Sequence, residues 1–297
     1  MSVRKAVIPI AGRGTRQLPA TWAIPKAMMP IVDRDGLAKP LIHLLVGEAF
    51  SAGVEQVALV VSPGQDADIR RYFRPFDDDL LAAVADRPEL LAVSDELARW
   101  GSRIKCIDQP TPEGFGHAVW CAKDWVGDEP CLMMLGDYVF VSNRAQSCAK
   151  QVVEVFERHA PAAVSGMFVC DAETLGRVGV MRGRPVKGEP ALYESELIVE
   201  KPSLEQARRD LVTPGLGRDR WLAHFGNHVF APAIFDELDQ MVADDVRERG
   251  EVQMTAAQER LRATGARYLA LTLDGHAHDA GIPAGWVAAQ HPLANWS

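Results

Sequence analysis

Apolar runs of strand length alternate with helix-like segments through the first half of the chain. The runs cover residues 6–11, 54–62, 103–109 and 130–137, and the stretches 40–52 and 116–126 between them have helical spacing. This alternation is typical of βαβ units, which build a mostly parallel sheet with helices on both faces. Ligands of such sheets bind at the carboxyl ends of the strands. We therefore expect a Rossmann-like α/β fold with its site at that edge.

The pattern changes after residue 170, where short β-type segments follow at 178–183, 191–202 and 221–232. Helical periodicity returns at 232–243 and 253–264, and residues 74–100 have the pattern of two short amphipathic helices. We expect a single domain over 1–297, with a smaller β-rich part at 171–266. The segment 267–297 is expected to form a last strand and helix that return to the first sheet or its edge.

Composition excludes several classes of function. The net charge is −8 without a basic run, which argues against nucleic acid or an anionic membrane as partner. No apolar run approaches the roughly 20 residues of a membrane helix, and the N-terminus has no signal-peptide pattern, so we expect a cytoplasmic protein. The five cysteines are odd in number and form no C-x-x-C pair, which disfavours a disulfide scaffold or a zinc site.

A candidate phosphate-binding loop follows the first apolar run. That run ends in GRGTR at 12–16, and Pro25-Lys26 comes shortly after it. Glycines let the backbone approach an anion, and Arg16 and Lys26 bring positive charge to the same place. The dinucleotide fingerprint would need a third glycine where Gln17 stands, and the Walker ending Gly-Lys-Ser/Thr does not occur. A nucleoside triphosphate is the expected ligand, and a tight turn after a strand is the alternative for G-x-G alone.

Acidic residues at two places and a pair of histidines at a third invite a metal interpretation. Asp137 ends the strand-like run in MLGDYVF, where a carboxylate can hold Mg²⁺ or simply form a turn. His276 and His278 alternate in the late segment HAHD, but no third nitrogen or sulfur ligand is evident for a transition metal. The aspartate triplet 77–79 is better explained by capping at the start of a helix.

Residues 4–32, RKAVIPIAGRGTRQLPATWAIPKAMMPIV, resemble the opening of the bacterial sugar-1-phosphate nucleotidylyltransferases, specifically the UTP–glucose-1-phosphate uridylyltransferases. The segment GFGHAVWCAKDWVGDEPCLMMLGDYVF is similar to the same family, and the resemblance covers nearly the whole chain. It implies an enzyme that makes UDP-glucose and pyrophosphate from UTP and glucose-1-phosphate with Mg²⁺. Residues 1–170 would then mainly bind the nucleotide and 171–266 the sugar. We also expect a homo-oligomer, a dimer or a tetramer.

The resemblance implies roles for individual residues. Arg16 would hold the leaving pyrophosphate, Lys26 the α-phosphate and Lys201 the attacking phosphate, while Asp137 and Asp279 would bind Mg²⁺. The nucleotide would be bound by Ala11, Gly12, Gly14, Thr15, Gln109 and Gly114, and the sugar phosphate by Gly179, Glu200 and Lys201. For the bare tripeptide Glu-Lys-Pro at 200–202, an ion pair at a strand end is the alternative.

Several positions depart from the family pattern. Trp22 and Pro283 stand where basic residues are usual, Val178 replaces a tyrosine, and Gly-Asn-His at 226–228 replaces Gly-Arg-Tyr. Five extra residues follow Asp33, and Gly136 before Asp137 is closer to the thymidylyltransferase form. A thymidylyltransferase, a uridylyltransferase for another sugar-1-phosphate, and a non-catalytic regulatory paralogue that binds nucleotide sugars are therefore the alternatives.

Overall fold

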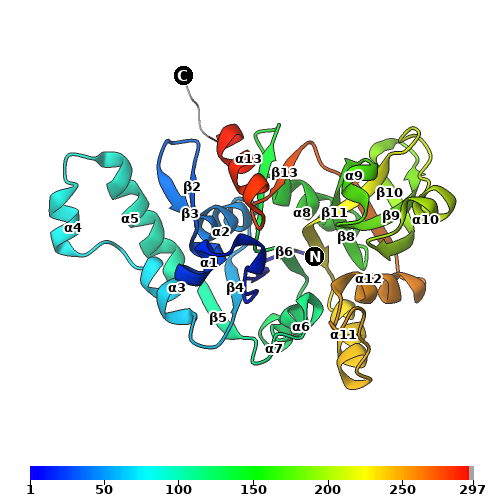
Figure 1. Cartoon of the computed structure of the whole chain (residues 1–297), viewed down its shortest axis with the longest axis horizontal. Coiled ribbons are helices and arrows are strands. Elements are labelled where there is room, and N and C mark those ends of the chain that lie inside the picture. The colour runs from blue at the N-terminus through cyan, green and yellow to red at the C-terminus, as the bar shows by residue number, and fades with distance from the viewer. Residues whose placement is uncertain (294–297) are drawn as a thin grey trace.

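The computed structural model describes the backbone of residues 1–293 and the side chains of residues 1–290, so 294–297, the end of the expected C-terminal segment, lie outside the described residues. One nine-stranded sheet runs through the molecule in the order β5-β4-β1-β6-β11-β8-β12-β10-β9 (Figure 1). Its strands are β1 (Lys5–Pro9), β4 (Gln56–Val61), β5 (Ile104–Asp108), β6 (Cys131–Met134), β8 (Ala163–Cys170), β9 (Gly179–Val186), β10 (Glu189–Glu200), β11 (Trp221–Phe230) and β12 (Tyr268–Thr272).

Two short strand pairs stand beside this sheet: β2 (Pro30–Val32) with β3 (Ala38–Pro40), and β7 (Tyr138–Ser142) with β13 (Gly275–Asp279). The helices are α1 (Ala20–Ala23), α2 (Leu41–Ser51), α3 (Asp66–Tyr72), α4 (Asp78–Ala83), α5 (Pro88–Gly101), α6 (Phe115–Trp120), α7 (Lys123–Val126), α8 (Cys148–His159), α9 (Ala172–Leu175), α10 (Leu204–Asp210), α11 (Ala233–Ala243), α12 (Met254–Ala263) and α13 (Pro283–Leu293). Two 3₁₀ turns, η1 (Thr15–Gln17) and η2 (Lys26–Met28), lie in the candidate phosphate loop.

The predicted fold class is confirmed. Strand β1 pairs in parallel with β4 and β6, and β4 with β5, as the βαβ alternation predicts. Strand β11 then runs antiparallel to β6 and β8, and β9 and β10 add further antiparallel pairs. The sheet is therefore mixed, with its parallel half built from the N-terminal residues.

Three details differ from the prediction. The C-terminal segment contributes two strands, and β12 lies inside the sheet, between β8 and β10, while β13 pairs with β7. The helix expected over 116–126 is two short helices, because α6 ends at Trp120 and α7 begins at Lys123. Strand β8 was not predicted, although its residues 163–167 are fully buried between β11 and β12.

The core lies on both faces of the sheet, because the buried strands alternate their side chains between two apolar clusters. In β1, Ile8 packs in the cluster under α2 and α8, whereas Val7 packs in the cluster under α6, α11 and α12. Strand β4 does the same with Leu59 and Val60. Both clusters exclude water, so the apolar strand runs of the sequence reflect burial on two faces.

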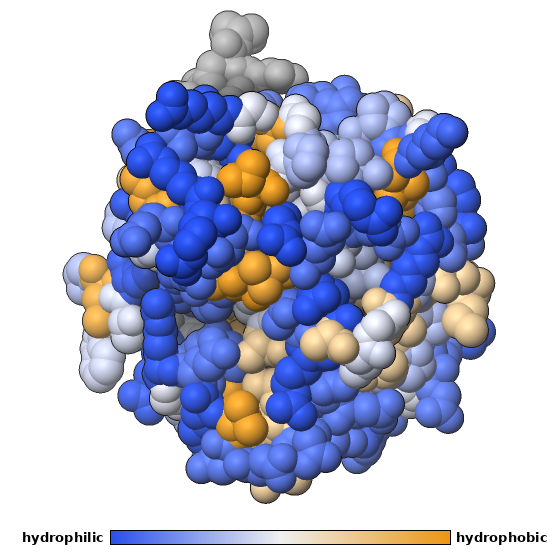
Figure 2. Space-filling view, turned by 90° about the vertical axis from the view of Figure 1, so that its right-hand side faces the viewer, coloured by the Kyte–Doolittle hydropathy of each residue, from blue (hydrophilic) through white to orange (hydrophobic). Residues whose placement is uncertain are grey.

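A third, smaller cluster around Leu175, Val180, Leu211 and Trp221 holds β9, β10, α9 and α10 together at the far end of the sheet. Figure 2 shows this end covered mainly by hydrophilic residues, with apolar residues in small separate patches. None of the helices in residues 1–293 has the length and hydropathy needed to cross a membrane. Asp77 caps α4 by accepting a hydrogen bond from the Leu80 amide at 2.9 Å, which confirms the capping interpretation of the acidic triplet.

Candidate active site

The predicted phosphate loop leaves β1 at the carboxyl edge of the parallel strands. Gly14 has a φ of 64° and starts η1, and a Cβ there would lie 2.9 Å from Thr21 Cγ2. Thr21 Oγ1 donates to the Gly14 carbonyl at 2.8 Å, and Ser62 Oγ donates to the Ala11 carbonyl at 2.6 Å. The loop is therefore a fixed turn tied to its neighbours, in a conformation that glycine adopts without strain.

Four predicted residues from distant segments meet beside this loop. The Lys26 ammonium lies 2.8 Å from Asp137 Oδ2. The Arg16 guanidinium donates from Nη2 to Asp137 Oδ2 at 3.2 Å and from Nη1 to Asp279 Oδ2 at 3.0 Å. A Cβ built on Gly12 would be 4.0 Å from Lys26 Nζ, so the backbone of the loop also approaches this ammonium.

The pairing of β7 with β13 places the two carboxylates together. Asp279 lies opposite Tyr138 in that pair, so it is next to Asp137 across the ladder. Burial and the nearby Asp137 carboxylate raise the pKa of Asp279, and Arg16 offsets part of this rise. Gly281 closes the cluster, because a Cβ there would be 2.6 Å from Asp137 Oδ2 and 2.9 Å from Asp279 Oδ1. The sequence analysis did not single out Gly281.

The donor set at this cluster fits Mg²⁺. The carboxylates of Asp137, just before β7, and Asp279, at the end of β13, are hard oxygen ligands, and a cation, the Arg16 guanidinium, already lies between them. Within the described residues, no group of three or more His, Cys, Asp or Glu side chains is arranged to hold a metal. The pair would therefore bind the ion together with phosphate oxygens and water, as Mg²⁺ usually does.

The predicted sugar-phosphate residues form a second group, around the end of β10. Lys201 follows β10 with a φ of 46°, an uncommon backbone conformation for a residue with a side chain, and its ammonium lies 3.1 Å from Glu200 Oε1. Thr255 at the start of α12 donates to Glu200 Oε2 at 2.8 Å. A Cβ on Gly179 would be 3.1 Å from that same carboxylate oxygen, so Gly179, Glu200 and Thr255 are in close contact.

The predicted base-reading residues lie in the segment between β5 and α6, with Gln109 directly after β5 and Gly114 at the start of α6. Gln109 is buried, and its Nε2 donates to the Gly114 carbonyl at 3.1 Å and lies 3.1 Å from His117 Nδ1. These two partners occupy both amide protons, so Oε1 is left as an acceptor. Gly114 has a φ of 107°, and a Cβ there would be 2.9 Å from the Val252 carbonyl.

A cavity of about 880 Å³ joins the two groups of charged residues. Arg16, Asp137 and Asp279 line it together with Glu200 and Lys201. Gln109 and Gly114 are not among its lining residues, whereas their neighbour Phe115 is. The sequence analysis assigned no role in the site to four other lining residues, Tyr138, His224, His228 and Thr255. The pattern of the elements that carry them predicts burial in the core and gives no sign of a site.

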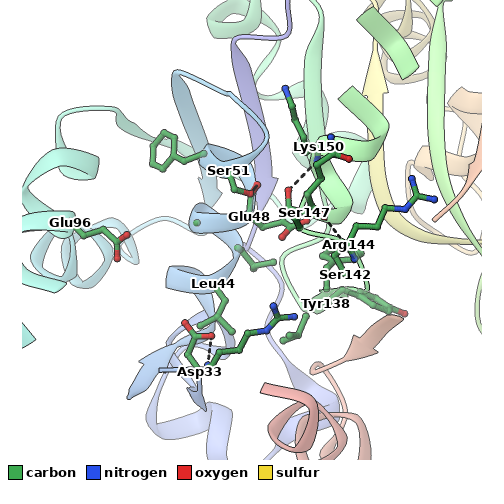
Figure 3. Close-up of a pocket in the computed structure, with 18 of the residues that line it drawn as sticks. Asp33, Leu44, Glu48, Ser51, Glu96, Tyr138, Ser142, Arg144, Ser147 and Lys150 are labelled. Atoms are coloured by element: carbon green, nitrogen blue, oxygen red, sulfur yellow. Dashed lines mark hydrogen bonds between the residues drawn. The ribbon is translucent and has the colours of Figure 1, made fainter. Parts of the chain in front are cut away.

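A second cavity of about 760 Å³ lies on the other side of β7, between α2, α5 and α8 (Figure 3). It contains none of the predicted site residues. Its polar groups serve the fold, because Glu48 accepts a hydrogen bond from the Ala149 amide at 2.7 Å and Ser147 caps α8 through the Lys150 amide. Burial raises the pKa of Glu48 to about 7.

The departures from the family pattern have structural explanations. The extra residues after Asp33 close the β2–β3 hairpin, where Lys39 Nζ pairs with Asp33 at 2.7 Å and with Asp35 at 2.6 Å. Pro283 is the first residue of α13, a position that favours proline. Trp22 is 88% exposed and lies outside the cavity lining. None of these three changes removes a residue of the charged cluster.

Comparison with known proteins identifies the family of this chain. A family model described as nucleotidyl transferase matches residues 5–295. The chain belongs to that family. UTP–glucose-1-phosphate uridylyltransferase of Bacillus subtilis (strain 168) is 33% identical over 287 residues, covering 96% of this chain and 89% of the relative. A Streptococcus pyogenes serotype M3 protein named UTP–glucose-1-phosphate uridylyltransferase 1 is 34% identical over 300 residues, covering 98% and 90%.

Solved structures of this family resemble the chain over its length. An apo UDP-glucose pyrophosphorylase superposes with a TM-score of 0.82 at 27% identity, covering 97% of each chain. A UTP-bound enzyme from Acinetobacter baumannii superposes with a TM-score of 0.78 at 27% identity, covering 97% of this chain and 92% of that one. Family membership, predicted from the motifs, is thus confirmed. Nucleotidyltransferases of this kind generally use a divalent metal.

Proposed function

We propose that this chain transfers a uridylyl group from UTP to glucose-1-phosphate, forming UDP-glucose and pyrophosphate. The observation that carries the proposal is the single cavity lined by Arg16, Asp137, Asp279, Glu200 and Lys201. Lys26 is outside the lining but pairs with Asp137 at 2.8 Å. Such an arrangement can hold a triphosphate and a sugar phosphate together. The names of the relatives at 33% and 34% identity support the choice of substrates.

The proposed reaction is a single in-line displacement. A phosphate oxygen of glucose-1-phosphate attacks the α-phosphorus of UTP, a new P–O bond forms, and the bond to the β-phosphate breaks so that pyrophosphate leaves with its electron pair. No covalent enzyme intermediate is needed, so the protein aligns the substrates and neutralises charge. Lys201, which pairs with Glu200 in the cavity lining, would hold the attacking phosphate, and Lys26, which pairs with Asp137, would hold the α-phosphate.

Arg16 has to exchange partners when UTP binds. Its guanidinium joins Asp137 and Asp279, and Arg16 is itself part of the loop that would hold the leaving pyrophosphate. A bidentate guanidinium matches phosphate oxygens as well as it matches carboxylates. We infer that Arg16 moves from the carboxylates to the pyrophosphate, and that Asp137 and Asp279 then hold Mg²⁺. When bound there, Mg²⁺ would supply electrostatic stabilisation to the phosphate oxygens.

The proposed base is uracil. Gln109 Oε1 remains free to accept a hydrogen bond from the imide N–H, and the Gly114 backbone is adjacent. Thymine presents the same edge, so this contact alone does not separate UTP from dTTP. At Gly136 the backbone lies so close to β1 that a side chain would not fit, because a Cβ there would be 2.2 Å from the Pro9 carbonyl oxygen. The departure from the usual uridylyltransferase form at this position therefore has a local steric cause.

Release of pyrophosphate tests the proposal when UTP, dTTP, CTP and ATP are each supplied with glucose-1-phosphate and Mg²⁺. We expect turnover with UTP to exceed that with the others. Preference for dTTP would establish the thymidylyltransferase alternative. Binding of UDP-glucose without turnover of any nucleotide would establish the non-catalytic alternative. The expected homo-oligomer, a dimer or tetramer, stays a prediction that light scattering can test.

A further inference from the structure

Strand β11 is interrupted where it passes the cavity. His224 pairs with Met167 of β8, and the next paired residue, Asn227, faces Gly166, so Phe225 and Gly226 are extra. Gly226 has a φ of 79°, and a Cβ on it would lie 2.2 Å from Leu135 side-chain atoms. Bulges of this kind redirect side chains beside active sites. Here the bulge shortens the distance along the strand, because His224 and His228 lie opposite Met167 and Ser165, only two positions apart on β8, and the two rings stack with centroids 5.2 Å apart.

A buried polar network holds the His228 ring. Ser165 Oγ lies 2.6 Å from His228 Nδ1 and 2.7 Å from the Tyr268 hydroxyl, and Gln258 Nε2 lies 3.2 Å from the same Nδ1. An amide nitrogen only donates, so Nδ1 accepts. Burial and the neighbouring His224 lower the pKa of His228 well below its usual value, which keeps the ring neutral. A neutral ring whose Nδ1 accepts carries its proton on Nε2.

The Nε2–H of His228 is therefore a fixed donor next to the cavity. His228 is only 3% exposed and lines the cavity together with Thr255, Gln258, Glu200 and Lys201. Among the described side chains, no hydrogen bond reaches Nε2. Nε2 is also not one of the fully buried unpartnered atoms, so it is accessible from the cavity and can donate to a ligand hydroxyl oxygen there.

We propose that His228 is a specificity-determining residue for the sugar, whose Nε2–H donates to one hydroxyl of the hexose bound between β11 and α12. Ser165 and Gln258 are positioning residues that fix the tautomer. The inference rests on the proposed function for the presence of a hexose phosphate beside Glu200 and Lys201. His228 stands where the family usually has a tyrosine, so a contact from the histidine ring would be specific to this chain and not common to the family.

The test compares His228→Phe with His228→Gln in the full-length protein. Phenylalanine keeps the aromatic packing on His224 and loses the donor, whereas a glutamine amide can place an N–H near the Nε2 position. At saturating UTP, His228→Phe should raise KM for glucose-1-phosphate about 10- to 100-fold and leave KM for UTP unchanged. His228→Gln should recover much of this loss, and Ser165→Ala should raise the same KM by less.

His43→Gln is the matched control, because His43 is also 3% exposed but sits in α2, where Tyr72 and Glu96 engage its two nitrogens. It should leave both KM values at the wild-type level. Monodeoxy analogues of glucose-1-phosphate identify the hydroxyl, since one analogue should lower kcat/KM in the wild type and not in His228→Phe. A wild-type KM for glucose-1-phosphate in His228→Phe, or equal losses for every analogue in both proteins, would overturn the proposal.

Calorimetry separates this inference from the proposed function. If the wild type makes no UDP-glucose, titration with UDP-glucose and with UDP still measures what the hexose adds to binding. We expect UDP-glucose to bind more tightly than UDP. The ratio of the two dissociation constants should be about 10-fold or more smaller in His228→Phe. The same ratio in both proteins would refute the role of His228 whether or not the chain is an enzyme.

Discussion

Asp137 and Asp279 accept hydrogen bonds from a single guanidinium, that of Arg16, at 3.2 Å and 3.0 Å. The β7–β13 ladder brings these carboxylates together from distant segments of the chain, and Gly281 leaves the space between them open. Burial, and repulsion from the Asp137 carboxylate, raise the pKa of Asp279. The pair therefore requires a cation, and Arg16 supplies it in the absence of substrates.

Replacing either carboxylate should change the dependence on metal. In Asp137→Asn and in Asp279→Asn the shape is kept and a hard anionic ligand is lost, so activity should fall steeply and need more Mg²⁺ for half-saturation. The measurement is initial rate against Mg²⁺ concentration. Asp274→Asn is the control, because Asp274 pairs with Arg144 outside the cavity lining. Full wild-type turnover in excess EDTA would contradict the metal site.

Lys26→Ala should remove most activity without unfolding the protein. The ammonium lies 2.8 Å from Asp137 at the end of a loop, and losing a charge that stabilises the transferring group typically lowers the rate about 10² to 10³-fold. Steady-state kinetics gives the rate, and circular dichroism reports the fold. Lys105→Ala, which changes an exposed lysine on β5, should behave like the wild type. Near-wild-type turnover in Lys26→Ala would place the phosphate site elsewhere.

Gln109→Ala should weaken UTP binding by about 1–3 kcal/mol, the usual cost of leaving buried polar groups unpaired. The change removes the Oε1 acceptor and also frees the Gly114 carbonyl and His117 Nδ1. Titration calorimetry with UTP measures the effect. Binding of inorganic pyrophosphate is the internal control, because it lacks a base and should be unaffected. Unchanged UTP affinity would show that the base lies away from α6.

Stability should fall in mild acid because of buried neutral histidines. Burial lowers the pKa of His224 from 6.5 to about 3, and within the described residues neither of its ring nitrogens has a partner. Below pH 6.5, the ordinary pKa of histidine, His224 takes up a proton in the unfolded chain but stays neutral in the folded chain. The stabilising effect is thus present above pH 6.5 and lost as pH falls towards about 3.

One such histidine lowers the free energy of unfolding by about 2 kcal/mol between pH 7 and pH 5. His224→Phe should therefore show a shallower loss over that range in urea denaturation. His276→Asn changes an exposed histidine of β13 and should keep the wild-type slope. Identical slopes in His224→Phe and wild type would show that His224 is protonated or hydrated in the fold.

Much of the fold and part of the site could be predicted from local pattern. The strand ends that carry Arg16, Asp137 and Lys201 are visible because an apolar run stops at a glycine or a charged residue. Gly281 and Thr255 could not be predicted in this way, because their importance arises from neighbours more than 50 residues away. The same holds for His228, whose donor depends on a bulge and on partners in β8 and α12.

The central claim is that a uridylyl group passes from UTP to a sugar phosphate in one step. The direct test supplies UTP radiolabelled at the α-phosphorus, and separately at the γ-phosphorus, with glucose-1-phosphate and Mg²⁺. The α-label should appear in UDP-glucose and the γ-label in pyrophosphate, with no label on the protein after denaturation. Label retained on the protein would contradict the single displacement, and absence of labelled UDP-glucose would contradict the proposed function itself.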